Sequence, residues 1–189
     1  MIRLVFISFF IVLKISFAFP QSLQFYEEAL FFEIRDGYFE VDGQYYFKNS
    51  GSHDIHQILF YPFPLDEMHG KIDSVFITDI AGFEEDLIIN QTEKGVSFRL
   101  SIEAGKEKIY RIYYRQRAPD RRAKYILTTT GQWGQPLKKA FYQLKMPSDI
   151  SITYFSYPPD KEEKQRNYRI YYWYMESFMP DKDFVVEWE

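Results

Sequence analysis

The chain has 189 residues, of which 46% are hydrophobic and 20% aromatic, a composition that excludes an intrinsically disordered protein. Its net charge of −4 argues against a nucleic acid as the partner, because phosphate binding needs a concentrated basic surface. Cysteine is absent, so disulfides and a lipid anchor on cysteine are excluded.

The N-terminal residues predict an export signal. Arg3 supplies an early positive charge, residues 4–13 are almost entirely apolar, and Ser16 and Ala18 are the small residues that a signal peptidase recognises. The apolar run is about half as long as the ~20 residues that a membrane-spanning helix needs. We therefore expect residues 1–18 to be a cleaved signal peptide.

Two alternatives to cleavage remain open at the sequence level. Lys14 lies late in the apolar run, where an ideal signal has no charge, so an uncleaved N-terminal anchor or an ordinary buried segment also fits. Residues 19–189 contain no second apolar stretch of membrane-spanning length and no linker, which predicts one domain with no membrane span after signal removal. The lack of cysteine favours a bacterial periplasmic or secreted protein.

Segments with the alternating or apolar pattern of β-strands follow one another along the mature chain, with turn residues between them. No stretch has a convincing amphipathic helical pattern. This arrangement predicts an all-β fold, an antiparallel β-sandwich of about ten strands in two sheets. Strands are expected over residues 26–35, 38–48, 55–63, 71–80, 87–90, 96–102, 106–117, 125–130, 139–146, 150–155, 168–175 and 184–188.

The first expected strand is followed by Asp36-Gly37, a strong signal for a tight turn into the second strand. Its alternation places five side chains on one mostly apolar face: Tyr26, Glu28, Leu30, Phe32 and Ile34.

The patterns of three later segments predict their local structure. Asp42-Gly43 interrupts the second strand and predicts a bulge or a second turn. Residues 55–63 are apolar on both faces, which predicts a central strand. Residues 158–167 are highly charged without an apolar pattern, which predicts a mobile loop.

The sequence predicts no metal site, catalytic residue or cofactor. His53, His56 and His69 could in principle hold zinc, but a strand of about eight residues separates its ends by ~25 Å, so we expect surface histidines. No Gly-x-Ser-x-Gly nucleophile elbow is present. The paired carboxylates, such as Glu27-Glu28, are interpreted as solvated faces.

The aromatic side chains are the best candidates for binding. Both faces of residues 168–175 are bulky, so one face packs in the core and the other is either covered or available to a partner. Tyr171 and Trp173 are the candidates on this strand. Trp133 lies between Gly131 and Gly134, where its ring could either pin the loop or bind a ligand.

Three segments together resemble a group of uncharacterised exported bacterial domains with an immunoglobulin-like sandwich. They are residues 41–49, with a Tyr-x-Phe-x-Asn corner, residues 125–137, with the segment Thr129-Thr130-Gly131-Gln132-Trp133, and residues 178–186, with a Phe-x-Pro-x-x-Asp corner. The resemblance implies an immunoglobulin-like all-β fold and export, but no activity.

We therefore expect an exported, non-enzymatic β-sandwich that serves as a structural or protein-interaction module of the bacterial cell envelope. Its exposed aromatics and sheet edges would contact an envelope protein or a second copy of the chain. The alternative is a carbohydrate-binding module that uses Trp133 together with one or two tyrosines to bind a glycan.

Overall fold

The computed structural model describes residues 22–66, 69–80, 85–87 and 89–189, and the signal peptide predicted for residues 1–18 lies outside them. The predicted all-β fold is confirmed. The described part of the chain holds one short 3-10 helix, η1 (Thr128–Trp133), and no helix in it is long and apolar enough to cross a membrane. The strands are β1 (Leu23–Arg35), β2 (Tyr38–Asn49), β3 (Ile55–Pro62), β4 (Ile72–Asp79), β5 (Glu85–Asp86), β6 (Ile89–Thr92), β7 (Gly95–Ile102), β8 (Glu107–Arg117), β9 (Arg122–Tyr125), β10 (Leu137–Pro147), β11 (Ile152–Phe155), β12 (Lys161–Lys164), β13 (Tyr168–Phe178) and β14 (Phe184–Trp188).

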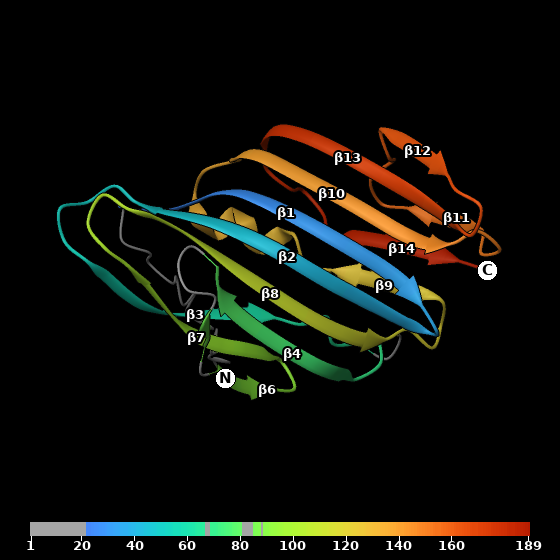
Figure 1. Ribbon diagram of the computed structural model, residues 1–189, viewed down its shortest axis with the longest axis horizontal. Helices are drawn as coiled ribbons and strands as arrows, with labels where there is room; N and C mark the ends of the chain where they lie inside the picture. The colour runs from blue at the N-terminus through green and yellow to red at the C-terminus, as the bar shows by residue number, and fades with distance from the viewer. Residues whose placement is uncertain (1–21, 67–68, 81–84, 88) are drawn as a thin grey trace, which may run out of the picture.

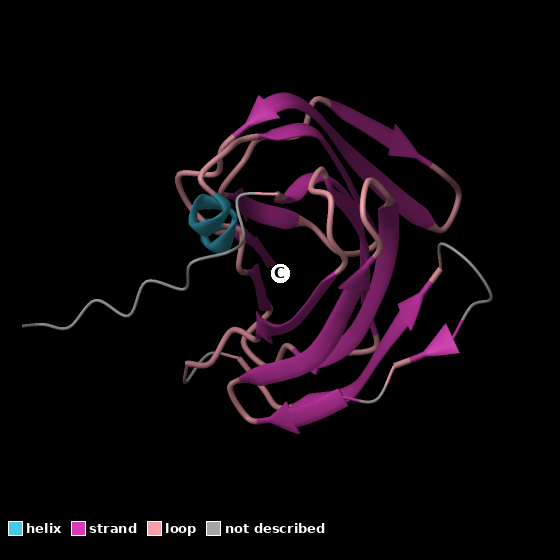
Figure 2. Cartoon of the chain, turned by 90° about the vertical axis from the view of Figure 1, so that its left-hand side faces the viewer, coloured by secondary structure: helices cyan, strands magenta, loops and turns pink. Residues whose placement is uncertain are grey.

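The described strands form three sheets rather than the expected two (Figure 1). A large sheet has the order β12-β13-β10-β1-β2-β8-β4-β5, and two small sheets have the orders β11-β14-β9 and β3-β7-β6. The central pair β1 and β10 is parallel, so the large sheet is mixed and not wholly antiparallel. Figure 2 shows the large sheet as an open arc with the small sheets on its inner side.

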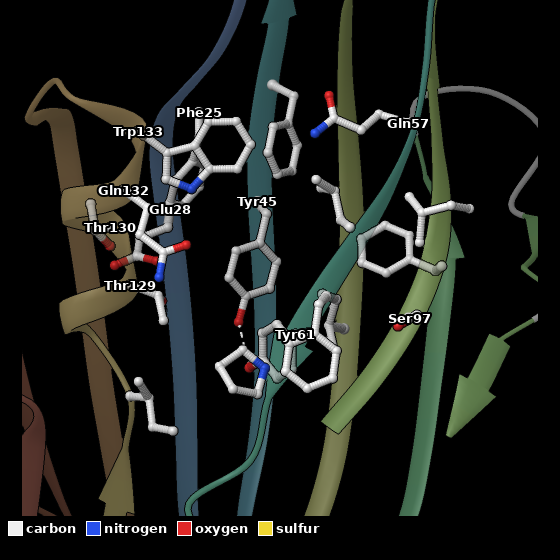
Figure 3. A pocket seen from close by; sticks show the side chains of 18 of the residues that line it. Phe25, Glu28, Tyr45, Gln57, Tyr61, Ser97, Thr129, Thr130, Gln132 and Trp133 are labelled. Carbon is white, nitrogen blue, oxygen red and sulfur yellow. Dashed lines mark hydrogen bonds between the residues drawn. The ribbon is translucent and has the colours of Figure 1, made fainter. Parts of the chain in front are cut away.

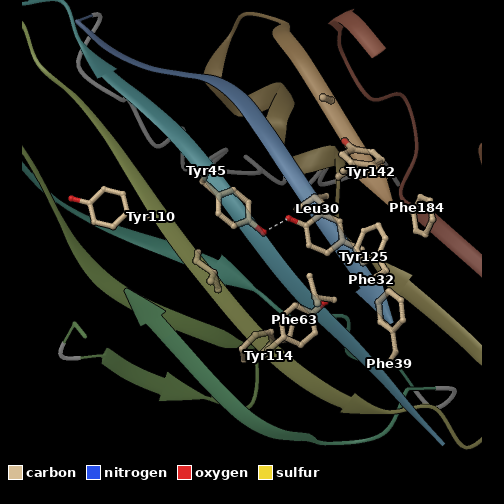
Figure 4. Close-up of a cluster of buried hydrophobic side chains, with 14 of the residues drawn as sticks. Leu30, Phe32, Phe39, Tyr45, Phe63, Tyr110, Tyr114, Tyr125, Tyr142 and Phe184 are labelled. Atoms are coloured by element: carbon tan, nitrogen blue, oxygen red, sulfur yellow. Dashed lines mark hydrogen bonds between the residues drawn. The ribbon is translucent and has the colours of Figure 1, made fainter. Parts of the chain in front are cut away.

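Both small sheets pack on the same face of the large sheet through aromatic contacts (Figure 4). Phe32 of β1 stacks on Phe184 of β14 with ring centroids 4.7 Å apart, and Tyr110 of β8 packs on Phe98 of β7 at 5.6 Å. All four side chains are buried. The core therefore lies between the large sheet and the two small ones, as in a sandwich with a divided second layer.

The first hairpin follows the prediction from its turn dipeptide. Arg35 pairs with Tyr38 across the turn, and Asp36 and Gly37 have φ angles of 53° and 78°. Two consecutive positive φ angles are what a two-residue turn between twisted strands requires.

The predicted break at Asp42-Gly43 is wrong, because β2 continues through it in register with both neighbours. Gly43 instead makes room for a ring. A Cβ atom at this position would lie 2.4 Å from the hydroxyl oxygen and 2.6 Å from two ring carbons of Tyr45, closer than nonbonded atoms can approach. The glycine thus allows the side chain of Tyr45 to lie flat along its own strand.

The irregularity in this hairpin lies in β1 instead. Its register with β2 shifts between Phe25 and Glu27, so Tyr26 is an extra residue that reverses the alternation. Phe25 and Glu28 consequently both face inward, although they are three residues apart, and both are buried. The prediction that Tyr26 shares the inner face is wrong, since its hydroxyl bonds the exposed Glu107.

Two further segments differ from what the sequence predicts. β3 is an edge strand rather than a central one, and its apolar outer face leaves Ile58 and Phe60 60% and 54% exposed. Residues 161–164 of the expected mobile loop form the charged strand β12 at the edge of the large sheet, where charge discourages pairing with another chain.

The expected strand 125–130 ends at Tyr125, and the chain then turns into η1. Asp183 explains the change, because its Oδ1 accepts hydrogen bonds from the backbone N–H groups of Leu127 and Thr128, each at 3.1 Å. The Thr128 hydroxyl donates to the same oxygen at 2.8 Å. A contact from a distant part of the sequence therefore overrides the β-propensity of three consecutive threonines.

The close approach at Gly43 predicts the effect of a single methyl group. Gly43→Ala should lower the free energy of unfolding by about 1–3 kcal/mol, because the Tyr45 ring is buried and cannot move away freely. Gly131→Ala is the matched control, since an added Cβ there has no atom within 4 Å. Urea denaturation measures both, and equal stability of the two variants would contradict the packing argument.

Candidate functional site: a cavity between the three sheets

A cavity of about 530 Å³ lies where the two small sheets meet the large one, a size typical of small-molecule sites (Figure 3). Three regions line it: β1, β2 and β8 of the large sheet, β3 and β7 of one small sheet, and the end of β9 with η1 on the other side. The division of the second layer thus leaves a space that side chains do not fill.

One wall is a cluster of three aromatic rings. Phe25 of β1 and Phe47 of β2 stack with centroids 5.2 Å apart, and the indole of Trp133 packs against them at 5.7 and 5.5 Å. Trp133 is the last residue of η1, and Gly134 ends this helix in the left-handed conformation with φ of 70°. The helix therefore fixes the indole on the cavity wall.

The hydroxyl groups of three tyrosines that line the cavity contact one another. The Tyr45 hydroxyl lies 2.7 Å from that of Tyr125 and 2.9 Å from that of Tyr61. Each tyrosine comes from a different sheet, so this contact ties the three sheets together. Burial raises the pKa of all three phenols well above the usual value, so they remain neutral donors at physiological pH.

Glu28 is the charged group of the cavity lining. The alternation of β1 from Glu28 to Ile34 points it inward beside Tyr45, its register partner on β2, and Glu28 is 2% exposed. The Tyr142 hydroxyl donates to Oε1. Burial raises the pKa of this carboxyl to about 7, although the hydrogen bond from Tyr142 lowers it.

The cavity lining has one acid and no base among its described residues, since none of them is lysine, arginine or histidine. The remaining polar groups are neutral. They are the side chains of Gln57, Ser97, Thr129, Thr130 and Gln132 (Figure 3). The arrangement can therefore bind an apolar molecule and hydrogen-bond its polar end, with a single carboxyl as the source of charge.

The structure places the three predicted binding residues in different surroundings. Trp133 both packs inward and lines the cavity, so the two interpretations of its ring are compatible. Tyr171 and Trp173 face the core and are only 5% and 2% exposed, so the expectation of a partner surface at these two residues is wrong. The Trp173 indole donates to the carbonyl of Tyr157 at 2.9 Å.

The histidines do not come together. His53 and His56 are exposed as expected, whereas the side chain of His69 is 2% exposed and its Nδ1 lies 2.5 Å from Asp66. The described residues contain no group of three or more histidine, aspartate or glutamate side chains that could hold a metal ion.

Sequence reasoning missed Glu28 as a site residue. The signal was its position on an otherwise apolar strand face, where a carboxylate is costly unless it has a partner or a function. Tyr45 carried no such signal, because aromatic residues on an inward face are ordinary core residues.

The buried carboxyl predicts an unusual dependence of stability on pH. The pKa of Glu28 in the folded protein, about 7, lies above the ordinary glutamate value of 4.5, so the folded protein keeps a proton that the unfolded chain releases between these two pH values. Stability should therefore fall by roughly 3 kcal/mol as the pH rises from 4.5 to 7, and this contribution should level off above pH 7.

Glu28→Gln tests this prediction, because the amide keeps an acceptor for Tyr142 but cannot ionise. The stability of the variant relative to wild type should rise through the same pH window, as measured by urea denaturation at pH 5 and pH 8. Glu27→Gln, on the outer side of β1, is the matched control and should show no such trend. Parallel pH profiles for wild type and Glu28→Gln would contradict the burial argument.

No protein-family model matches this sequence, and no curated protein matches it significantly. Solved structures do match. A proposed nutrient-binding protein from Legionella pneumophila has a TM-score of 0.64 and 11% identity, with 88% of this chain and 67% of that chain covered. The M1 zinc metallopeptidase of Deinococcus radiodurans has a TM-score of 0.53 and 10% identity, with 89% of this chain and 43% of that chain covered. At these identities the likeness concerns the fold alone.

Proposed function

We propose that this chain is a non-enzymatic binding module that holds a small, largely apolar ligand in the cavity between its three sheets. The observation that carries the proposal is the cavity itself, about 530 Å³ lined mainly by apolar and aromatic side chains with a few convergent polar groups. Rigid strands supply most of the lining, so the site is preformed and binding needs little reorganisation.

Two further observations support a ligand site over a packing defect. The rings of the aromatic wall and the three tyrosine hydroxyls are held by contacts with one another, so they keep the space open. The structurally similar protein from Legionella pneumophila is described as nutrient binding, which agrees with a ligand in this fold but is a property of that protein.

We also propose that the module acts outside the cytoplasm, in the periplasm or after secretion. The support is the apolar N-terminal run with its early charge and small residues before position 19. N-terminal sequencing of the protein recovered from the native host tests this part, with cleavage after residue 18 as the expected result and an intact N-terminus as the contradictory one.

Blocking the cavity tests the ligand site directly. Gln57→Trp should reduce the affinity for N-phenyl-1-naphthylamine, an apolar fluorescent probe, by roughly tenfold or more, because the indole would occupy the space that the probe needs. His56→Trp is the matched control, since His56 is the neighbouring residue on the exposed face of β3. The absence of saturable probe binding to wild type, or equal binding to both variants, would refute the ligand site.

A second candidate function is protein interaction through the edge of β3, with a second copy of the chain as the partner. Its support is the outer face of this edge strand, where Ile58 and Phe60 are largely exposed, because an unpaired apolar edge favours association. The carbohydrate alternative has less support, since the indole of Trp133 packs on Phe25 and Phe47 and offers no open platform.

Sedimentation velocity at increasing concentration separates this candidate from the first. A dimer that Ile58→Lys abolishes would support interaction through β3. Phe76→Lys is the control, because Phe76 is similarly exposed, at 57%, but belongs to β4 of the large sheet. A monomer at all concentrations, or equal loss of the dimer in both variants, would rule out self-association at this edge.

A further inference from the structure

We propose that the ligand of the inter-sheet cavity is a small organic cation, an alkyl- or arylammonium compound, whose charged nitrogen binds the Glu28 carboxylate. This inference rests on the proposed function and narrows it to one chemical class. It follows from the charge of the cavity lining, from the position of Glu28 and from the rings around it.

Glu28 lacks a partner cation in the described cavity lining. Its described hydrogen bond comes from a neutral phenol, Tyr142, and the described lining contains no basic side chain. A buried carboxylate without a cation is unfavourable by several kcal/mol, so such groups are usually paired or neutral. An ammonium ligand would supply the missing charge inside the cavity.

The Glu28 carboxyl lies among aromatic rings. Phe25 lies on the same inward face of β1, on the other side of the bulge, and Tyr45 is the register partner of Glu28 on β2. Trp133 and Phe47 extend this aromatic wall. Ring faces attract cations, most strongly when water is excluded, and recognition of alkylammonium ligands uses this combination of rings and charge.

The charge of the cavity lining discriminates between classes of ligand. An anionic ligand would meet an acid with no base to offset it, and a neutral ligand would leave the carboxylate without a partner. The hydroxyls of Tyr45, Tyr61 and Tyr125 could hydrogen-bond a polar group in any ligand, so they do not select the class. Glu28 is therefore the group that favours cationic ligands over anionic and neutral ones.

The same geometry makes binding depend on pH. The titratable groups that face Glu28 are four phenols, namely Tyr142 on β10, Tyr45 on β2, Tyr61 on β3 and Tyr125 on β9. All four remain neutral near pH 7, because burial raises the pKa of each. The carboxyl of Glu28, with a pKa of about 7, is therefore the group that changes charge in this range.

Calorimetric titration with three probes of equal chain length tests the inference: hexylammonium, 1-hexanol and hexanoate, at pH 8. We expect hexylammonium to bind roughly tenfold tighter than hexanol, and hexanoate to bind weakest, because a hydrogen bond to a charged group adds to the common apolar contacts. Lowering the pH to 6 should weaken hexylammonium binding by roughly tenfold and leave hexanol binding unchanged, since the ionised fraction of Glu28 falls by that factor.

Two variants identify the residue. Glu28→Gln should make hexylammonium bind no tighter than hexanol, and Glu27→Gln should keep the wild-type preference for hexylammonium. Saturable hexanol binding with no preference for hexylammonium, or tighter binding of hexanoate, would overturn the cation and leave the ligand site standing. Binding of none of the three probes would instead refute the ligand site itself.

Discussion

The reversal of alternation in β1 is the constraint on which the site depends. One extra residue, Tyr26, turns Phe25 toward the interior face that alternation already gives to Glu28, so an aromatic ring and a carboxyl lie on the same face. Without the bulge, either the aromatic wall or the acid would face solvent. One local irregularity thus brings together the two features that give the cavity its chemical character.

The division of the second layer supplies the space around that carboxyl. A single sheet opposite β1, β2 and β8 would bring side chains into the cavity, whereas two small sheets leave a gap that η1 borders on one side. The hydroxyl cluster of Tyr45, Tyr61 and Tyr125 holds the three sheets at this point. Gly43 contributes to this contact, because the absence of a Cβ atom there lets the Tyr45 side chain reach Tyr61 and Tyr125.

The features that could be predicted from the sequence are those that short segments specify alone. Asp36-Gly37 encodes its turn through positive φ angles, and the alternation of Phe39, Val41, Tyr45 and Phe47 encodes the inner face of β2. The features that could not be predicted depend on distant residues. η1 depends on Asp183, more than fifty positions further along the chain, and β3 is an edge strand because of sheet order.

The same distinction explains what was found of the candidate site. Trp133 stood out because of its glycine neighbours, and the structure places it on the cavity wall. Tyr171 and Trp173 stood out equally. Bulky side chains on both faces of a strand do not show which face points inward, and these two residues lie on the core face. Glu28 was missed because a pair of glutamates in a strand usually indicates a solvated edge, although alternation placed Glu28 on an otherwise apolar face.

The pKa of Glu28 reports whether its carboxyl is buried beside the cavity. Carboxyl ¹³C resonances of protein labelled at glutamate can be followed by NMR against pH, with Glu28→Gln identifying the signal. A carboxyl buried beside this cavity should titrate near pH 7. A Glu28 signal that titrates near the ordinary glutamate value of 4.5 would mean that the side chain is solvated and does not lie buried beside the cavity.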